Sequence, residues 1–223
     1  DVCSSDLGGV EEISWNSDGS AVAYTCKKQV GTDYAFSTNS DIYLYNLNTE
    51  ETKNLTEGMV GYDKQPTFSP DGKKMSWISM ERAGFEADKE RLFVLDLETG
   101  EKVYLTKNFD YSAGNVLWTS DGKSLYFISG VEATYQVYKM ALTDEKPVAI
   151  TQGMHDYHSI AFLGDNIVGS KVSIVKPAEL YLVDSKTGSE TELTFINKET
   201  LSQLKMPEVK QRWVKSTDGK MVH

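Results

Sequence analysis

The pattern of apolar and polar positions is most regular in residues 67–79, which read TFSPDGKKMSWIS. Thr67 and Phe68 precede a polar segment, and β-favouring residues including Met75 and Trp77 follow it in partial alternation. Within the segment SPDGK, proline presets φ, aspartate can hydrogen-bond its own backbone, and glycine can adopt a positive φ. The pattern therefore predicts a β-hairpin with a type I turn and a glycine bulge.

Nearly the same pattern recurs along the chain. Residues 117–129 read LWTSDGKSLYFIS, an earlier copy covers residues 13–24, and a less regular one covers residues 162–168. A second predicted hairpin follows each copy, at residues 41–56, 91–106, 136–151 and 179–194. The turn residues Asp18, Asp71 and Asp121 are 53 and 50 positions apart. A repeated unit of this length with four short strands is typical of a β-propeller blade.

The repeats predict an all-β fold, namely a partial, open β-propeller of about four four-stranded antiparallel blades. Each sheet can bury its faces only against a neighbouring sheet, which explains why the unit is repeated. We place the blades at residues 8–57, 58–107, 108–152 and 153–195. Seven or eight blades are more usual for this kind of repeat, so we expect an open arc rather than a closed ring.

The two ends depart from the repeat. Residues 1–7, DVCSSDL, match the translation of a common sequencing adapter, and we interpret them as a non-native segment outside the fold. Residues 196–223 contain the helix-favouring stretch NKETLSQLK, which Pro207 would end, and then a strand, a turn and the start of another strand. This last hairpin could open a fifth blade. We favour the first hairpin of a different domain, because a helical connector is foreign to the repeat.

Composition narrows the classes of function. The chain of 223 residues is 39% hydrophobic, and no stretch approaches the roughly 20 apolar residues of a membrane span. Its formal net charge of −10 argues against a nucleic-acid partner, because neutralising phosphates requires a basic surface. The acidity itself indicates solubility rather than a particular ligand.

Candidate binding residues lie in the predicted connections at one end of the blades, where function usually concentrates. The segment MERAGFEADKE (80–90) is dense in charge, and aspartate–tyrosine pairs recur between blades. The candidates are Glu81, Arg82 and Glu86 in this segment, and Tyr62, Asp63, Asp110, Tyr111, His155, Asp156 and Tyr157 between blades. The charged residues could meet a charged peptide end or form a solvated ion-pair network. The aspartates could equally accept backbone N–H bonds from a neighbouring blade.

The sequence offers no catalytic residue, metal site or cofactor. It contains no G-x-S-x-G nucleophile motif and no glycine-rich phosphate loop. His155 and His158 are three positions apart, but they lie in a predicted loop entering a strand with no third ligand nearby. We therefore predict that the chain performs no covalent chemistry by itself.

The repeats resemble the propeller of the prolyl oligopeptidase family of serine peptidases. The likeness rests on SPDGK, on strands of the type IYLYNL and on the closing NLT or YLT. It becomes more specific at residues 38–47, 57–100 and 212–220, which resemble the later blades and the start of the hydrolase domain of a bacterial dipeptidyl-peptidase V type enzyme. The resemblance covers residues 8–223, although SPDGK alone also occurs in TolB-like propellers.

The resemblance implies a peptide substrate and an α/β-hydrolase domain after the propeller, carrying a Ser-Asp-His triad. It implies that the propeller gates access while the triad releases dipeptides from free peptide N-termini, with a periplasmic or secreted location and a possible homodimer. The fragment itself would be inactive, since no triad position falls within it. The alternatives are a non-enzymatic TolB-like interaction module and an enzyme with a metal in its channel, against which the lack of clustered histidines argues.

Overall fold

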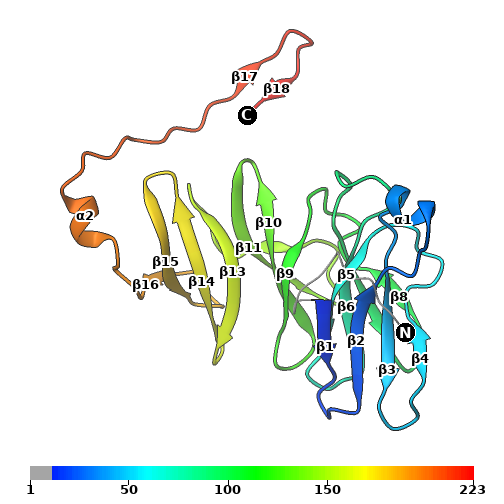
Figure 1. The fold of residues 1–223 in the computed structure, drawn as a ribbon. Coiled ribbons are helices and arrows are strands. Elements are labelled where there is room, and N and C mark those ends of the chain that lie inside the picture. The colour runs from blue at the N-terminus through cyan, green and yellow to red at the C-terminus, as the bar shows by residue number, and fades with distance from the viewer. Residues whose placement is uncertain (1–11) are drawn as a thin grey trace. The chain divides into compact units, whose positions relative to one another are not determined.

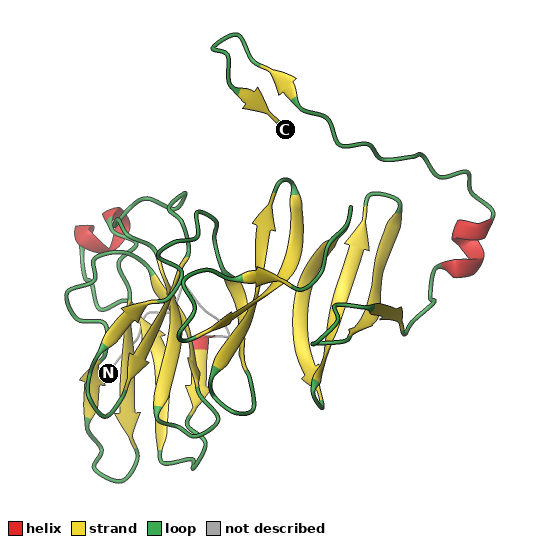
Figure 2. Cartoon of the chain, turned by 180° about the vertical axis from the view of Figure 1, so that it is seen from behind, coloured by secondary structure: helices red, strands yellow, loops and turns green. Residues whose placement is uncertain are grey.

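The computed structural model of the chain describes residues 12–223, so the interpretation of residues 1–7 as a non-native segment lies outside the described residues. Strands make up almost all of the regular structure, and the helices are short (Figure 2). The strands form four four-stranded antiparallel sheets and one two-stranded hairpin. The all-β fold class predicted from the sequence is therefore confirmed.

Each four-stranded sheet is built from four consecutive strands of the chain (Figure 1). The first sheet contains β1 (Ile13–Trp15), β2 (Ala21–Cys26), β3 (Asp41–Asn46) and β4 (Thr52–Asn54). The second contains β5 (Asp63–Phe68), β6 (Lys74–Ser79), β7 (Arg91–Asp96) and β8 (Lys102–Tyr104). The third contains β9 (Gly114–Trp118), β10 (Ser124–Val131), β11 (Thr134–Ala141) and β12 (Val148–Ala149). The fourth contains β13 (Asp156–Leu163), β14 (Asn166–Ser173), β15 (Lys176–Val183) and β16 (Glu190–Glu192).

The turn predicted within SPDGK forms as expected. The Oδ1 atom of Asp71 accepts the backbone N–H of Lys73 at 3.1 Å, and Gly72 has φ of 70°. Phe68 pairs with Met75 across the turn. A short polar side chain closes the turn and glycine takes the left-handed conformation at little cost, so the local sequence alone specifies this hairpin.

A threonine closes each repeat by capping the third strand of its own sheet. The Oγ1 atom of Thr56 accepts the backbone N–H of Ile42 at 3.0 Å. The same contact recurs in the other three sheets, from Leu92 to Thr106, Val137 to Thr151 and Leu180 to Thr194. The closing NLT and YLT motifs therefore have a structural role, because the threonine satisfies one backbone N–H group of each third strand.

The described chain divides into two compact units. The first comprises the described residues up to Tyr126 together with Met140–Pro147. Its core lies between the first two sheets, where Ala23 and Ile42 pack with Phe68, Met75 and Trp77, all of them buried. The strand β5 contacts β1, β2 and β3 on one side and β9 on the other. Burial of these large side chains is the main stabilising contribution to this unit.

The second unit comprises Phe127–Lys139 and the residues from Val148 onward. Ile167 and Val183 are fully buried on one face of its sheet β13–β16. Leu180 and Leu193, on the other face, are each 43% exposed. The corresponding residues of the first sheet, Ile42 and Leu55, are 0% and 6% exposed. This face of the fourth sheet therefore has the composition of a core but is not covered as one.

After the fourth sheet the chain leaves the four-stranded repeat. The helix α2 spans Lys198–Ser202, and β17 (Val214–Lys215) pairs with β18 (Met221–Val222). The turn between them uses Asp218, whose Oδ1 atom accepts the backbone N–H of Lys220 at 3.2 Å. The last hairpin thus uses the same turn chemistry as the repeats, although an irregular segment separates it from them.

Candidate functional site

Three connections at one end of the first unit are joined to one another by backbone contacts. The Gly84 N–H donates to Thr38 Oγ1 at 2.9 Å, which ties the β6–β7 connection to the β2–β3 connection. Ser40 bridges to Tyr62, and the Met80 N–H donates to the Tyr62 carbonyl at 3.0 Å. These connections therefore form a continuous surface, which we call the loop platform (residues 27–40, 55–62 and 80–90).

Gly61 shows how closely the loop platform is packed. A Cβ atom at this position would lie 2.1 Å from the backbone carbonyl oxygen of Met80. No side chain can be accommodated at that distance, because the obstacle is backbone and cannot turn aside. The loops are thus held by the fold rather than merely attached to it, as a binding surface requires.

The charged part of the platform is organised around Arg82. Its guanidinium forms a bidentate ion pair with Asp88, with one Nε–Oδ1 contact of 2.9 Å, and stacks over the Phe85 ring at 3.8 Å. The hydrogen bond from Arg82 keeps the pKa of Asp88 below its ordinary value. Glu81 lies 3.8 Å from Arg91, and Glu86 is exposed. Arg82 is therefore engaged in an internal pair, whereas the carboxylates of Glu81 and Glu86 face solvent.

The side chains of Tyr62 and Asp63 differ in how far they are buried. Tyr62 is half-buried under the Lys64 ammonium, which lies 5.0 Å from its ring. Asp63 is fully buried, and its Oδ1 atom accepts the indole N–H of Trp77 at 3.2 Å. Its other oxygen, Oδ2, has no hydrogen-bond partner in the described part of the chain. Burial raises the pKa of Asp63 to about 6, against the lowering effect of nearby hydroxyl and indole donors.

Asp110 and Tyr111 lie in the connection between β8 and β9, which is exposed. Tyr111 is 40% exposed and its ring lies 5.4 Å from that of Phe109. The Lys89 ammonium donates to the Phe109 carbonyl at 2.9 Å, so the loop platform contacts this connection too. Asp110 and Tyr111 are thus the most accessible of the predicted aspartate–tyrosine pairs.

The predicted residues His155, Asp156 and Tyr157 belong to the second unit. Asp156 Oδ1 accepts the backbone N–H of Tyr135 at 2.8 Å, which is the structural role considered as the alternative for these aspartates. The Tyr157 hydroxyl donates to Glu190 Oε1 at 2.5 Å. His155 packs edge-on against Tyr157 and its Nε2 atom lies 3.4 Å from the same Glu190 oxygen.

Glu190 is the centre of this polar cluster, and the sequence analysis did not single it out. Its Oε2 atom also accepts from the Lys171 ammonium at 2.9 Å. Burial acts to raise the pKa of Glu190, but the neighbouring His155 imidazole and hydrogen bonds from Tyr157 and Lys171 outweigh it and lower the pKa to about 2. No local signal marks Glu190, because its partners lie at least 19 positions away along the chain.

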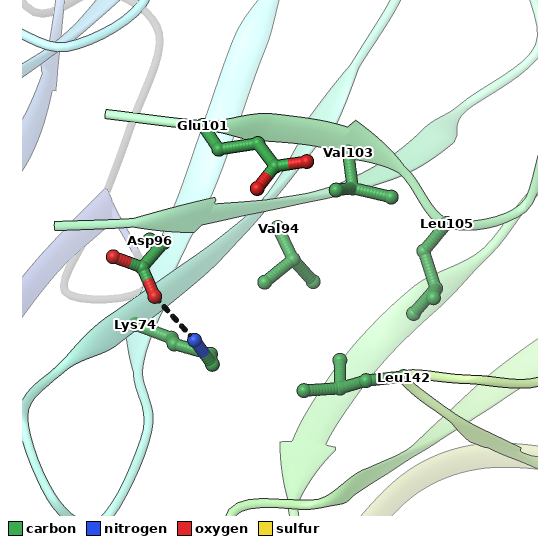
Figure 3. A pocket seen from close by; sticks show the side chains of 7 residues that line it. All are labelled: Lys74, Val94, Asp96, Glu101, Val103, Leu105 and Leu142. Atoms are coloured by element: carbon green, nitrogen blue, oxygen red, sulfur yellow. Dashed lines mark hydrogen bonds and ion pairs between the residues drawn. The ribbon is translucent and has the colours of Figure 1, made fainter. Parts of the chain in front are cut away.

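A groove on the second sheet lies away from the loop platform and encloses about 210 Å³. Figure 3 shows Val94, Val103, Leu105 and Leu142 around it, with the Lys74–Asp96 ion pair at one side. Hydrogen bonds from Lys74 and from the backbone of Thr99 hold the pKa of Asp96 far below its ordinary value. The lining is mainly apolar, and Lys74 is paired with Asp96, so we assign the groove to the gap left where neighbouring sheets diverge outward.

The described residues contain no group of histidine, cysteine, aspartate and glutamate side chains able to hold a metal ion. Within the same residues, no helix is both long enough and apolar enough to cross a membrane. The candidate site is a surface of loops that carries hydroxyls, carboxylates and aromatic rings.

The fold defines the class of protein, a β-propeller in which four-stranded sheets hold the connecting loops. The chain belongs to the TolB beta propeller domain family, PD40, whose model matches residues 12–202. It is 43% identical over 211 residues to dipeptidyl-peptidase 5 of Porphyromonas gingivalis, covering 95% of this chain and 31% of that protein. It is 47% identical over 208 residues to dipeptidyl-peptidase 5 of Porphyromonas endodontalis, covering 93% of this chain and 30% of that protein. The resemblance to dipeptidyl-peptidases predicted from the sequence is confirmed.

Solved structures show the same fold. An acylaminoacyl peptidase of Pyrococcus horikoshii matches with a TM-score of 0.70 at 22% identity, over 90% of this chain and 30% of that chain. A structure described as putative TolB from Agrobacterium tumefaciens matches with a TM-score of 0.63 at 18% identity, over 81% and 63% of the two chains. This chain thus spans about a third of the length of the peptidases that it matches.

Proposed function

We propose that this chain is the substrate-gating propeller of a serine exopeptidase that releases dipeptides from peptide N-termini. The observation that carries the proposal is 43–47% identity to two dipeptidyl-peptidases 5 over 93–95% of this chain. The matched regions cover nearly the whole chain, connections as well as strands. The propeller selects peptides, and the chemistry belongs to another domain.

In this proposal the nucleophile, general base and oxyanion hole lie on an α/β-hydrolase domain that follows the propeller. We assign residues 196–223 to the linker and the first hairpin of that domain. Two observations support this assignment. The match to the propeller family ends at residue 202, and the hairpin β17–β18 is separated from the fourth sheet by α2 and an irregular segment. No residue of this chain is proposed as catalytic.

The loop platform supplies the proposed contacts with peptide. Glu81 and Glu86 are exposed carboxylates on a segment that Arg82 and Asp88 hold in place. They are suited to a peptide's N-terminal ammonium, because an exposed carboxylate attracts a cation without having to break an existing buried pair. Tyr62, Asp110 and Tyr111 lie on adjoining connections, where they would contact the rest of the peptide. His155, Asp156, Tyr157 and the buried Asp63 are proposed to position these connections rather than to touch peptide.

A kinetic experiment on the full-length protein tests the function. We expect cleavage of dipeptidyl 4-nitroanilides with alanine or another apolar residue in the second position, loss of cleavage when the N-terminus is acetylated, and inactivation by a serine-reactive phosphonate. Activity toward acetylated and free substrates alike would contradict an N-terminal exopeptidase. Absence of any peptidase activity, together with a gene that lacks a G-x-S-x-G motif, would favour a TolB-like interaction module.

The platform contacts need a separate test. In E81Q and E86Q we expect KM for free dipeptidyl substrates to rise about fivefold with kcat little changed, because each variant removes one attractive charge from ground-state and transition-state binding alike. E145Q removes a carboxylate from an exposed turn and is the matched control. Equal kinetics in all three variants would remove Glu81 and Glu86 from the site.

The proposal also concerns location and assembly. We propose that the full-length protein is periplasmic or secreted, that it forms a homodimer, and that peptide is its partner. Cell fractionation with a tagged full-length protein, followed by light scattering on the purified material, tests both statements. A cytoplasmic location would contradict the first, and a monomer of the expected mass would contradict the second.

A further inference from the structure

One position of the repeat carries an amide or a carboxylate in three successive copies. Glu12, Gln65 and Asn115 each stand six places before the turn aspartate of their repeat. Gln65 and Asn115 lie in β5 and β9, the first strands of their sheets, and Glu12 directly precedes β1. The first strands of the repeats lie side by side, since β5 contacts both β1 and β9. The three residues therefore follow one edge of the first unit, which we call the first-strand edge.

The backbone at this position is unusual. Gln65 has φ of 55° and Asn115 has φ of 51°, in the left-handed region that glycine adopts freely, asparagine tolerates and most other residues avoid. The pairing of β5 with β6 shifts register between Lys64 and Thr67, so Gln65 lies in a bulge of the strand. Bulges redirect a side chain out of the normal alternation and occur often next to functional sites. Glycine would fit this backbone at lower cost, yet both positions carry a carboxamide.

Glu12 fixes the bulge without using the Gln65 side chain. The Glu12 Oε2 atom accepts the backbone N–H of Gln65 at 2.9 Å and the Thr25 hydroxyl at 2.5 Å, and Glu12 is 6% exposed. The Gln65 side chain is half-buried, and its carboxamide makes no hydrogen bond within residues 12–223. Asn115 is exposed. A strained backbone and the buried Glu12 carboxylate therefore fix the position of Gln65. The side-chain amide of Gln65 itself has no partner among the described residues.

We infer that Gln65, together with Asn115, forms a carboxamide subsite that binds the main chain of an extended peptide along the first-strand edge. A carboxamide carries one acceptor and an NH₂ donor, which match the N–H and C=O groups of a peptide unit without reading its side chains. Such recognition suits a gate that must pass many sequences, and in a propeller the first strands face the central channel. The inference rests on the proposed function for the identity of the ligand as a peptide.

Direct binding tests the subsite independently of catalysis. The full-length protein, treated with a serine-reactive phosphonate, is titrated into a fluorescein-labelled decapeptide of alanine and serine, with anisotropy as the readout. A decapeptide whose backbone nitrogens are methylated is the control ligand, because it keeps the side chains but loses the main-chain donors. We expect the methylated peptide to bind at least tenfold more weakly than the unmodified peptide.

Two variants at Gln65 separate binding from structure. Q65G suits the positive φ and removes the amide, so we expect an unchanged or higher melting temperature with about tenfold weaker binding. Q65N keeps the amide in a residue that tolerates this conformation, so binding should stay within about twofold of wild type. Unchanged peptide binding in Q65G, or a lower melting temperature in Q65G, would overturn the inference.

Failure of the carboxamide subsite can be distinguished experimentally from failure of the proposed exopeptidase function. If the untreated protein has no peptidase activity but binds the unmodified decapeptide in a Gln65-dependent manner, the subsite stands and the exopeptidase assignment fails. If the protein cleaves dipeptidyl substrates with wild-type kinetics while Q65G binds the decapeptide normally, the assignment stands and the subsite fails.

Discussion

Replacing Asp63 by asparagine should stabilise the protein at neutral pH and leave its stability at pH 4 nearly unchanged. Asp63 is fully buried, receives one hydrogen bond from the Trp77 indole, and leaves Oδ2 without a partner among the described residues. Burial, with a smaller contribution from the nearby Asp41 carboxylate, raises the pKa of Asp63 from 3.8 to about 6. An asparagine has the same shape and accepts the same indole N–H, but carries no charge.

The sign and size of the effect of D63N on the free energy of unfolding follow from proton linkage. The folded state holds the Asp63 proton more tightly than the unfolded state, whose pKa stays near 3.9. The stabilising contribution of protonated Asp63 is therefore complete below about pH 4 and is lost as the pH rises through about 6. The interval between 3.8 and about 6 corresponds to roughly 3 kcal/mol of unfolding free energy, as an order of magnitude. At pH 8 the unfolding free energy of D63N should therefore exceed that of wild type by this amount.

The assay is urea denaturation of wild type and D63N at pH 4, 5, 6 and 8, with intrinsic tryptophan fluorescence as the signal. The difference in unfolding free energy between the two proteins should grow between pH 4 and 6 and then level off. D110N replaces an exposed carboxylate in the same unit and should show no such growth. A difference between D63N and wild type that does not change with pH would refute the reasoning, whatever its size.

Three further predictions concern stability. Thr56→Val should cost about 1–3 kcal/mol of unfolding free energy, measured by urea denaturation, because it leaves the buried N–H of Ile42 without its acceptor. Gly122→Ala should lower the melting temperature, at a cost of about 1 kcal/mol, because Gly122 has φ of 64°. Gly114→Ala, where no positive φ and no close atom opposes a Cβ, is its control and should be neutral. Glu190→Gln should destabilise by about 1–2 kcal/mol at pH 7, a value reduced for partial exposure, with the loss disappearing as the pH falls toward 2, since the low pKa stabilises only the charged form. Equal urea midpoints at pH 7 would contradict the last of these.

The hairpins could be predicted from the sequence because their determinants are local. The Asp71 side chain reaches the Lys73 backbone two residues on, and Gly72 supplies the positive φ, so a window of a few residues contains the whole interaction. The same holds for Asp218 in the last hairpin. Because the hairpin pattern recurs along the chain, it also predicts the repeated sheets. Each sheet can bury its faces only against a neighbouring sheet, so the repetition predicts that the sheets stack.

The environment of the candidate side chains could not be predicted in this way. Asp63 and Asp110 stand in similar positions in the sequence, but the first is fully buried beside Trp77 and the second is exposed. The difference depends on a ring 14 positions away and on how the loops pack over it. The environment of Glu190 could not be predicted for the same reason, since the Tyr157 hydroxyl that donates to it is 33 positions away. Contacts at such separations are fixed by the three-dimensional packing and leave no pattern in a short window.

Because each sheet consists of four consecutive strands and is closed by its own threonine, no repeat lends a strand to another. A whole repeat could therefore be duplicated or lost in a gene without breaking a single hydrogen-bonded ladder elsewhere. Such an event would disturb the surfaces where apolar side chains of neighbouring repeats meet and the hydrogen bonds between repeats, such as those from Gly84 to Thr38 and from Gln65 to Glu12. The number of repeats in such a chain can therefore change more easily than the interior of any one of them.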